Sequence, residues 1–149
     1  MIREAKIEDI LKIVELLKEF YNSTDMIKVA NCDSESSIKT IKGLIENENT
    51  TIMIIDIDGK IVGCLGAVVL PYYFNFQCLT GHEFFWFVSE KYRGTKESLK
   101  LFKVIEEWAK NKGAKTMIMT SLVYNIDALK KFYKRNQYVE LETSFIRSF

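Results

Sequence analysis

The sequence predicts a mixed α/β fold, in which a mostly antiparallel central sheet of about six to seven strands carries helices on both faces. Strand-like runs rich in β-branched residues follow one another closely in the first half, as in hairpins. In the second half, helical periodicities alternate with short strands, an order that favours strand–helix–strand crossovers. The length of 149 residues fits a single domain over residues 1–149.

The first half has clear local signals for its element boundaries. Asp33 is a suitable N-cap for a helix, because its carboxylate can accept hydrogen bonds from first-turn N–H groups. Asp58-Gly59 between two apolar runs is the strongest short signal for a hairpin turn. We therefore expect a strand, two amphipathic helices and two further strands, over residues 2–5, 8–21, 33 onward, 51–57 and 60–70.

The second half begins with an aromatic-rich turn or loop over residues 71–76. Gly113 follows a long apolar-periodic stretch and is a suitable residue to end a helix there. The expected elements after the loop are a strand, the long helix, a strand, a second helix and two closing strands, over residues 82–88, 95–112, 116–120, 127–135, 138–141 and 144–148.

The composition indicates a soluble globular protein. Hydrophobic residues make up 48% of the chain and charged residues 28%. No apolar run approaches the roughly 18 residues that a membrane span requires. The charged start, Met-Ile-Arg-Glu-Ala-Lys, lacks the apolar centre of a signal peptide. We therefore expect a cytoplasmic protein without membrane contact.

The cysteine and histidine content argues against a disulfide scaffold and a structural zinc site. The chain has three cysteines without a C-x-x-C spacing, and His82 is the single histidine. We expect free thiols and no metal.

The charge distribution is uneven, with excess acidic side chains in residues 1–60 and excess basic ones afterwards. The pattern indicates either two ordinary solvated surfaces or a basic second half that meets an anion. A nucleic-acid-binding domain is a third, weaker alternative, because a pI near 7.6 falls short of a strongly basic footprint.

The stretch from Val88 to Leu99 is the most informative in the sequence. It reads as the end of a strand, a basic turn and the first turn of a helix. The first N–H groups of a helix lack partners within the helix, so they bind phosphate well. Gly94 permits a left-handed turn, and Arg93 and Lys96 add positive charge. The alternative is a plain strand-to-helix turn with a solvated basic rim.

This stretch resembles the acetyl-CoA-binding motif of the GNAT (Gcn5-related N-acetyltransferase) family. That motif is Arg or Gln, two residues, Gly, one residue, then Gly or Ala, and it falls here on residues 93–98. The order of elements is similar over nearly the whole chain, and Phe132-Tyr133 with Tyr138 resembles the family's F-Y-x-x-x-G-[FY] segment. The resemblance implies a transferase that moves an acetyl group from acetyl-CoA, as co-substrate, to a primary amine.

Three positions depart from the family's pattern. Lys96 replaces the first motif glycine, and Ser98 stands at the Gly/Ala position. A lysine needs a negative φ there, but its ammonium can pair with a phosphate. Small phage-type members look similar at this place. Gln137 replaces the usual glycine before Tyr138, which affects the end of the last helix. A catalytically inactive CoA-binding module that serves regulation is therefore the alternative function.

The resemblance implies a general base on the strand before the motif. His82 is the first candidate, because histidine exchanges protons near neutral pH, and Glu83 is the reserve. Regular alternation would place His82 with Phe84, Trp86 and Val88 on one face of the strand and Glu83 on the other, unless a bulge intervenes. A strand-end histidine with a local hydrogen bond is the simpler alternative.

The remaining site residues are expected from the same resemblance. Tyr133 takes the position of a tyrosine that protonates the departing CoA thiolate, with Tyr124 as its rival. Asn125 resembles the family's asparagine that binds the CoA chain, or it caps the last helix. Backbone N–H groups near Phe87 and Val88 would bind the oxyanion and the pantetheine arm.

Other features leave the partners open. Residues 72–76 include four aromatic side chains, which could cover the sheet end, wall the acceptor pocket or form a homodimer contact. We expect a small-molecule or peptide amine as the acceptor, and the acidic first half favours a cationic one.

Overall fold

The computed structural model describes residues 1–122 and 126–147. Residues 1–118 and 119–149 form two compact units, and each is described by itself. None of the helices within the described residues is both long enough and apolar enough to cross a bilayer.

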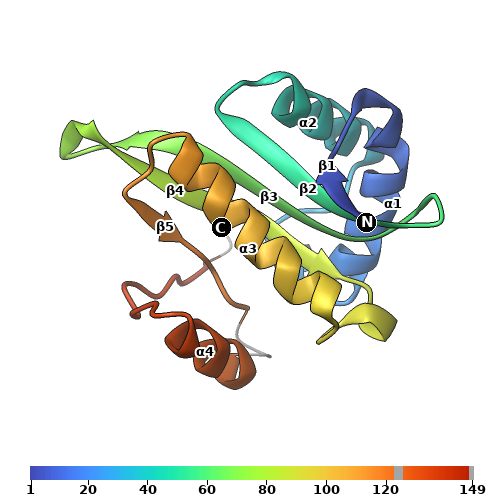
Figure 1. Ribbon diagram of the computed structural model, residues 1–149. Coiled ribbons are helices and arrows are strands. Elements are labelled where there is room, and N and C mark those ends of the chain that lie inside the picture. Colours follow the sequence, from blue (N-terminus) through green and yellow to red (C-terminus); the bar gives the residue numbers. More distant parts are fainter. Residues whose placement is uncertain (123–125, 148–149) are drawn as a thin grey trace. The chain divides into compact units, whose positions relative to one another are not determined.

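The first unit contains a five-stranded sheet (Figure 1). Its strands follow in chain order, and only the last pair is parallel. This confirms the mixed, mostly antiparallel sheet, with fewer strands than the six to seven expected. The strands are β1 (Ile2–Glu4), β2 (Thr50–Ile57), β3 (Lys60–Tyr72), β4 (Asn75–Val88) and β5 (Thr116–Ile118).

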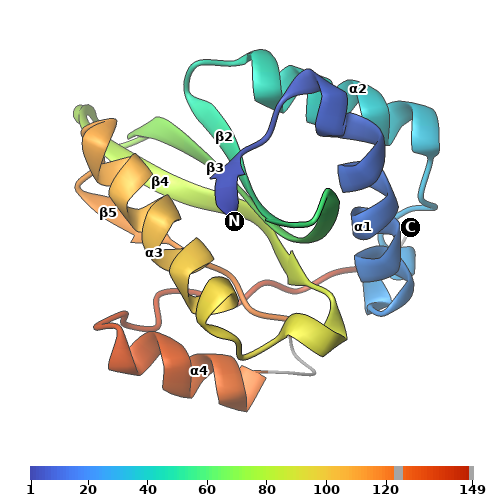
Figure 2. The same cartoon turned by 45° about the vertical axis from the view of Figure 1, so that its right-hand side comes forward.

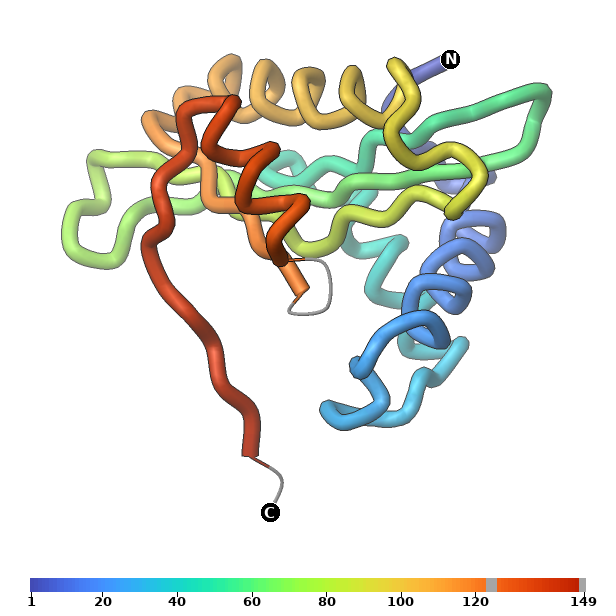
Figure 3. Tube along the Cα trace, turned by 90° about the horizontal axis from the view of Figure 1, so that it is seen from below, coloured from blue at the N-terminus to red at the C-terminus, as the bar shows by residue number. Residues whose placement is uncertain are grey.

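Helices cover both faces of this sheet, as predicted. Helices α1 (Ile10–Asn22) and α2 (Ser34–Glu46) lie on one face, and α3 (Lys96–Asn111) lies on the other (Figures 2 and 3). The Asp33 carboxylate accepts a hydrogen bond from the Ser36 N–H at 2.7 Å, which confirms Asp33 as the cap of α2. Short 3-10 helices lie at Ile7–Asp9, Asp25–Lys28 and Glu90–Tyr92.

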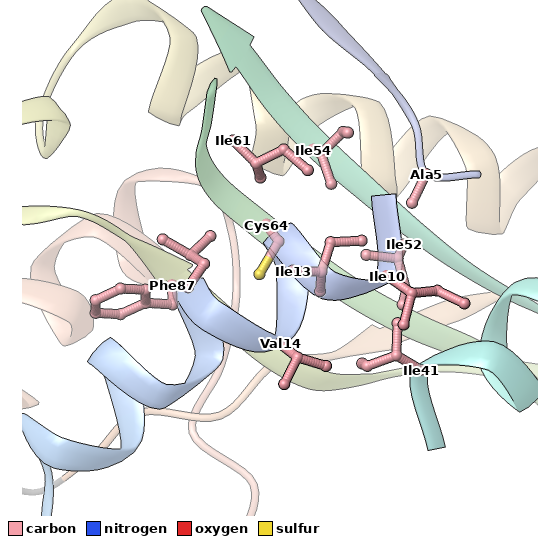
Figure 4. Close-up of a cluster of buried hydrophobic side chains, with 11 residues drawn as sticks. Ala5, Ile10, Ile13, Val14, Ile41, Ile52, Ile54, Ile61, Cys64 and Phe87 are labelled. Carbon is pink, nitrogen blue, oxygen red and sulfur yellow. The ribbon is translucent and has the colours of Figure 1, made fainter. Parts of the chain in front are cut away.

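A hydrophobic cluster joins α1 and α2 to the sheet (Figure 4). Ile13 of α1 and Ile54 of β2 are fully buried, and Cys64 of β3 lies among them. The opposite face of the sheet is covered by the apolar stripe of α3, in which Leu101, Phe102 and Ile105 are fully buried. Both helical stripes follow the periodicity from which the helices were predicted.

Two predicted turns have the expected backbone. Asp58 and Gly59 have φ values of 51° and 80°, as the two-residue hairpin turn between β2 and β3 requires. Gly113 has a φ of 88°, and Ala114 N–H donates to the Ala109 carbonyl at 3.0 Å. This arrangement ends α3 as a left-handed C-terminal cap.

The aromatic segment forms a short hairpin turn, one of the two forms (turn or loop) that the sequence predicted, but more of its residues belong to the strands than expected. Strand β3 continues through Pro71 to Tyr72 and β4 already starts at Asn75, so the hairpin turn is short. The register shifts between Pro71 and Tyr72, which accommodates the irregular tip. Tyr73, Phe74 and Phe76 are more than 70% exposed.

The second unit contains helix α4 (Ile126–Arg135). The closing strands predicted at 138–141 and 144–148 are wrong as far as the structure describes them, since residues 138–147 are neither helix nor strand. Val139 and Phe145 are 86% and 94% exposed. A β-branched pattern forms a strand only when a neighbour accepts its backbone hydrogen bonds, and no strand pairing is described for these residues.

Candidate active site

A β-bulge in β4 decides where the candidate base points. Gly66 pairs with Phe85 and Ala67 pairs with Glu83, so Phe84 is an extra residue without a partner in β3. Paired residues share a face of the sheet. His82 therefore lies on the same face as Val68, whereas Glu83 lies on the other face with Ala67.

The bulge corrects the predicted alternation. Beyond it, Phe85 and Phe87 share the α1–α2 face, because their partners Gly66 and Cys64 follow alternately on β3 and Cys64 belongs to that core. His82 thus lies on the face of Phe87, and not on that of Trp86 as regular alternation implied. The bulge comes after both candidate bases, so His82 and Glu83 still point to opposite faces.

Gly66 was the signal in the sequence that could have revealed the bulge. A Cβ atom there would lie 2.6 Å from the ring of Phe85, so only glycine leaves room for that ring. A glycine inside a strand often marks such a close approach or a bulge.

His82 has one hydrogen-bond partner among the described residues. Its Nε2 atom lies 2.8 Å from the hydroxyl oxygen of Thr80, which is 5% exposed. The parallel ladder between β4 and β5 covers only Thr80 to His82, opposite Thr116 to Ile118. His82 therefore stands where the two strands stop pairing, while β4 continues to Val88. Sequence reasoning did not identify Thr80.

The end of β4 is joined to the basic turn by Arg93. Its Nε donates to the Val88 carbonyl at 2.8 Å, and its guanidinium lies over the Phe87 ring at 5.4 Å from the centroid. Both Phe87 and Val88 are buried. The structure thus brings these three predicted residues together.

The N-terminus of α3 has the features expected of an anion site. Gly94 has a φ of 71°, and nothing lies within 4 Å of the place where a Cβ would stand. Thr95 is the N-cap, and its hydroxyl accepts a long hydrogen bond of 3.4 Å from Ser98 N–H. The described residues offer no acceptor to the N–H groups of Lys96 and Glu97.

These residues fit a pyrophosphate. Arg93 and Lys96 are exposed cations within three residues of the two N–H donors in the sequence, although the Glu97 carboxylate in the same turn opposes an anion. Lys96 is the first residue of α3 and does not have a positive φ, so its side chain is accommodated where the family has glycine. Ser98 is buried, and its hydroxyl donates to the Thr95 carbonyl at 2.8 Å.

The second unit contains Tyr133. Its hydroxyl donates to the Thr120 carbonyl at 2.8 Å, and its ring packs 5.5 Å from that of Tyr138. A proton transfer from Tyr133 to a leaving thiolate requires this hydrogen bond to exchange. Asn125 and Tyr124 lie outside the described residues.

Gln137 preserves the end of α4 in spite of the missing glycine. It has a φ of 65°, the left-handed conformation that glycine adopts easily. Tyr138 N–H donates to the Tyr133 carbonyl at 3.0 Å, and Gln137 N–H donates to the Lys134 carbonyl at 3.1 Å. Together these bonds form a Schellman cap.

The cysteines are all free thiols, as expected. Cys64 is fully buried, and burial raises the pKa of its thiol, which keeps it neutral and unreactive. Within the described parts of the chain, no three His, Cys, Asp or Glu side chains are grouped to hold a metal ion.

Comparison with protein families identifies the chain. The sequence model of the acetyltransferase (GNAT) family matches residues 10–137, which include the whole of the site described above. The chain belongs to the GNAT acetyltransferase family. It is therefore a member of an acyltransferase family, as the motif at residues 93–98 predicted. A search of curated proteins found no match.

Solved structures share the fold. An aminoglycoside acetyltransferase from an uncultured soil metagenomic sample is 20% identical, with a TM-score of 0.77 over 100% of this chain and 95% of its own. Glucosamine-6-phosphate N-acetyltransferase from Arabidopsis thaliana is 20% identical, with a TM-score of 0.77 over 100% and 97%. AAC(6')-Iy, in complex with the bisubstrate analogue CoA-S-monomethyl-acetylneamine, is 16% identical, with a TM-score of 0.79 over 100% and 97%.

Proposed function

We propose that this GNAT protein transfers the acetyl group of acetyl-CoA to a primary amine of a small molecule. The observation that carries the proposal is the N-terminus of α3. There, the N–H groups of Lys96 and Glu97 have no acceptor among the described residues, and the exposed side chains of Lys96 and, three residues earlier, Arg93 add positive charge. This combination suits a pyrophosphate, and the family membership makes CoA the natural source of one.

The acyl-transfer chemistry assigns distinct roles to the chain's residues. Acetyl-CoA supplies the acetyl carbon and a thiolate leaving group. His82 takes the proton that the amine nitrogen loses as it bonds to that carbon, directly or through a water. Backbone N–H groups near Phe87 and Val88 stabilise the oxygen that gains negative charge. Tyr133 gives a proton to the sulfur as the C–S bond breaks. Both units would then act as one catalytic domain.

Two observations support a cationic amino sugar as the acceptor. Two proteins of similar fold are named for amine-bearing sugars, an aminoglycoside and glucosamine-6-phosphate. The excess of acidic side chains in residues 1–60 favours a cationic acceptor over an anionic one. We therefore expect amino sugars to react faster than peptide amines of equal concentration.

Two measurements, made one after the other, test the proposal. A ligand at about 100 times its dissociation constant stabilises the folded protein by about 2.7 kcal/mol, so saturating acetyl-CoA should clearly raise the melting temperature. Release of free CoA thiol is then followed with a panel of aminoglycosides, amino sugars and peptides. An absent melting shift contradicts the proposal. A shift without thiol release from any acceptor favours the alternative, a CoA-binding module.

A further inference from the structure

The hydroxyl of Thr80 has two neighbours but only one proton. Its oxygen lies 2.8 Å from His82 Nε2 and 3.3 Å from the Leu70 carbonyl oxygen. A carbonyl oxygen can only accept a hydrogen bond, whereas an imidazole nitrogen can donate or accept according to its tautomer. If the hydroxyl donates to Leu70, it must accept from His82, and both contacts are then hydrogen bonds.

The opposite assignment satisfies only one contact. If the hydroxyl donates to Nε2, its proton points away from Leu70, and the hydroxyl no longer bonds to that carbonyl. Thr80 is 5% exposed, so water is a poor substitute for a partner on its buried side. The arrangement with two bonds therefore has the lower free energy.

We propose that Thr80 is a positioning residue that holds the proton of neutral His82 on Nε2 and leaves Nδ1 as the basic atom. The inference rests on the proposed function for its catalytic meaning. The chain of bonds runs from Nε2–H to the Thr80 oxygen, and from the Thr80 O–H to the Leu70 carbonyl. Among the described residues, Nδ1 has no hydrogen-bond partner, so its lone pair is available to an amine or a bridging water.

The strand geometry explains why this pair forms. Residues two apart on a strand share a face, so the side chains of Thr80 and His82 lie side by side. Both residues pair with β3 and with β5, which fixes their backbones from two sides. Thr80 thereby holds the imidazole at the place where the β4–β5 ladder ends.

The experiment uses the single histidine of this chain. Its ring signals in a ¹⁵N–¹³C NMR spectrum belong to one residue, and they distinguish the Nε2–H from the Nδ1–H tautomer at a pH where the ring is neutral. We expect mainly Nε2–H in the wild type and in Thr80→Ser, which keeps the hydroxyl. Thr80→Val keeps the shape and loses the hydroxyl, so the Nδ1–H population should rise.

Kinetics with acetyl-CoA and the best acceptor provide a second readout. Thr80→Val should lower kcat about tenfold, the effect of one lost hydrogen bond in the transition state, with little change in the KM for acetyl-CoA. Thr80→Ser should restore most of the rate. Thr116→Val is the matched control. Thr116 of β5 pairs with Thr80 of β4, but it is exposed and makes no described bond to His82.

The outcomes separate this inference from the proposed function. A dominant Nδ1–H tautomer in the wild type overturns the positioning role, as does an unchanged tautomer ratio in Thr80→Val. If Thr80→Val fails to fold, the wild-type and Thr80→Ser spectra still decide which nitrogen holds the proton. A tautomer shift in a protein that acetylates no amine supports the role of Thr80 and contradicts the proposed function alone.

Discussion

Arg3 binds Asp9 through two parallel hydrogen bonds of 2.7 and 2.9 Å, although Asp9 is only 3% exposed. The same guanidinium donates to the Asp56 carboxylate at 2.8 and 3.1 Å. Asp9 also accepts from the Lys6 N–H at 2.9 Å. One arginine in β1 thus joins the segment before α1 to β2.

Replacing this arginine should destabilise the fold strongly. Arg3→Met keeps most of the apolar stem but leaves the buried Asp9 charge without its partner. The expected loss is about 3 kcal/mol of unfolding free energy in urea titrations. Lys39→Met is a suitable control, because Lys39 pairs with Glu35 on an exposed helix surface. Its replacement should lower the unfolding free energy by less than about 0.5 kcal/mol. Equal effects of the two changes would contradict the structural role of Arg3.

The same cluster should make the protein sensitive to acid. The hydrogen bond from Arg3 is the largest cause that lowers the pKa of Asp9, and it likewise lowers the pKa of Asp56. A carboxyl with a lowered pKa in the folded state stabilises the fold above its unfolded pKa, about 3.9, and this contribution is lost as the pH falls through the folded value. Urea midpoints between pH 7 and pH 3 should therefore drop more steeply for the wild type than for Arg3→Met.

Reversing the charge at the start of α3 should weaken cofactor binding. In Lys96→Glu, a carboxylate replaces the ammonium beside the first-turn N–H groups, and the dissociation constant for CoA should rise by roughly tenfold to a hundredfold in calorimetry. Lys100→Glu makes the same change in net charge one turn further along an exposed face. Similar affinities for the two variants would show that Lys96 does not contact the pyrophosphate.

The faces of β4 make His82 and Glu83 separable by mutation. His82→Ala should lower turnover by about 10²–10⁴ and leave acetyl-CoA binding nearly unchanged, because the base acts on the amine proton. Glu83→Gln should retain most of the rate, since Glu83 points to the opposite face. The reverse pattern would identify Glu83 as the base and place the acceptor on the other side of the sheet.

Tyr133→Phe tests the proton donor for the leaving thiolate. The change keeps the ring and removes the hydroxyl that donates to the Thr120 carbonyl, so it should cost no more than about 1 kcal/mol of stability. CoA affinity should hold, whereas the acyl-transfer rate should fall. A wild-type rate in the alkaline range would mean that the thiolate leaves unprotonated. A variant that does not fold would indicate a structural tyrosine.

Local chemistry explains which parts of the fold could be predicted. The Asp58-Gly59 turn, the Asp33 cap and the Gly113 cap each depend on neighbouring residues in the chain, and all three have the expected geometry. The bulge at Phe84 depends on the partner strand, because Gly66 of β3 makes room for the Phe85 ring. Single-strand alternation therefore could not assign the face of His82 correctly.

The site was predictable in part for the same reason. The basic turn at residues 93–98 is one continuous segment, so its residue types and spacing were visible in the sequence. Thr80 was missed because an isolated threonine two residues before a histidine has no distinctive pattern. Its role depends on burial and on the Leu70 carbonyl, which β3 brings to it.

The bulge at Phe84 also sets the phase of side-chain alternation along β4. It divides the strand into two segments whose alternation is out of step by one residue. If Phe84 instead took part in regular pairing, every side chain from the hairpin tip to Glu83 would change faces, and His82 would lie on the α3 face. Deleting Phe84 has no such effect, because Glu83 and Phe85 already pair with the adjacent residues Ala67 and Gly66. The extra residue is therefore compatible with only one pairing of the two strands, the one that keeps His82 on the face of Phe87.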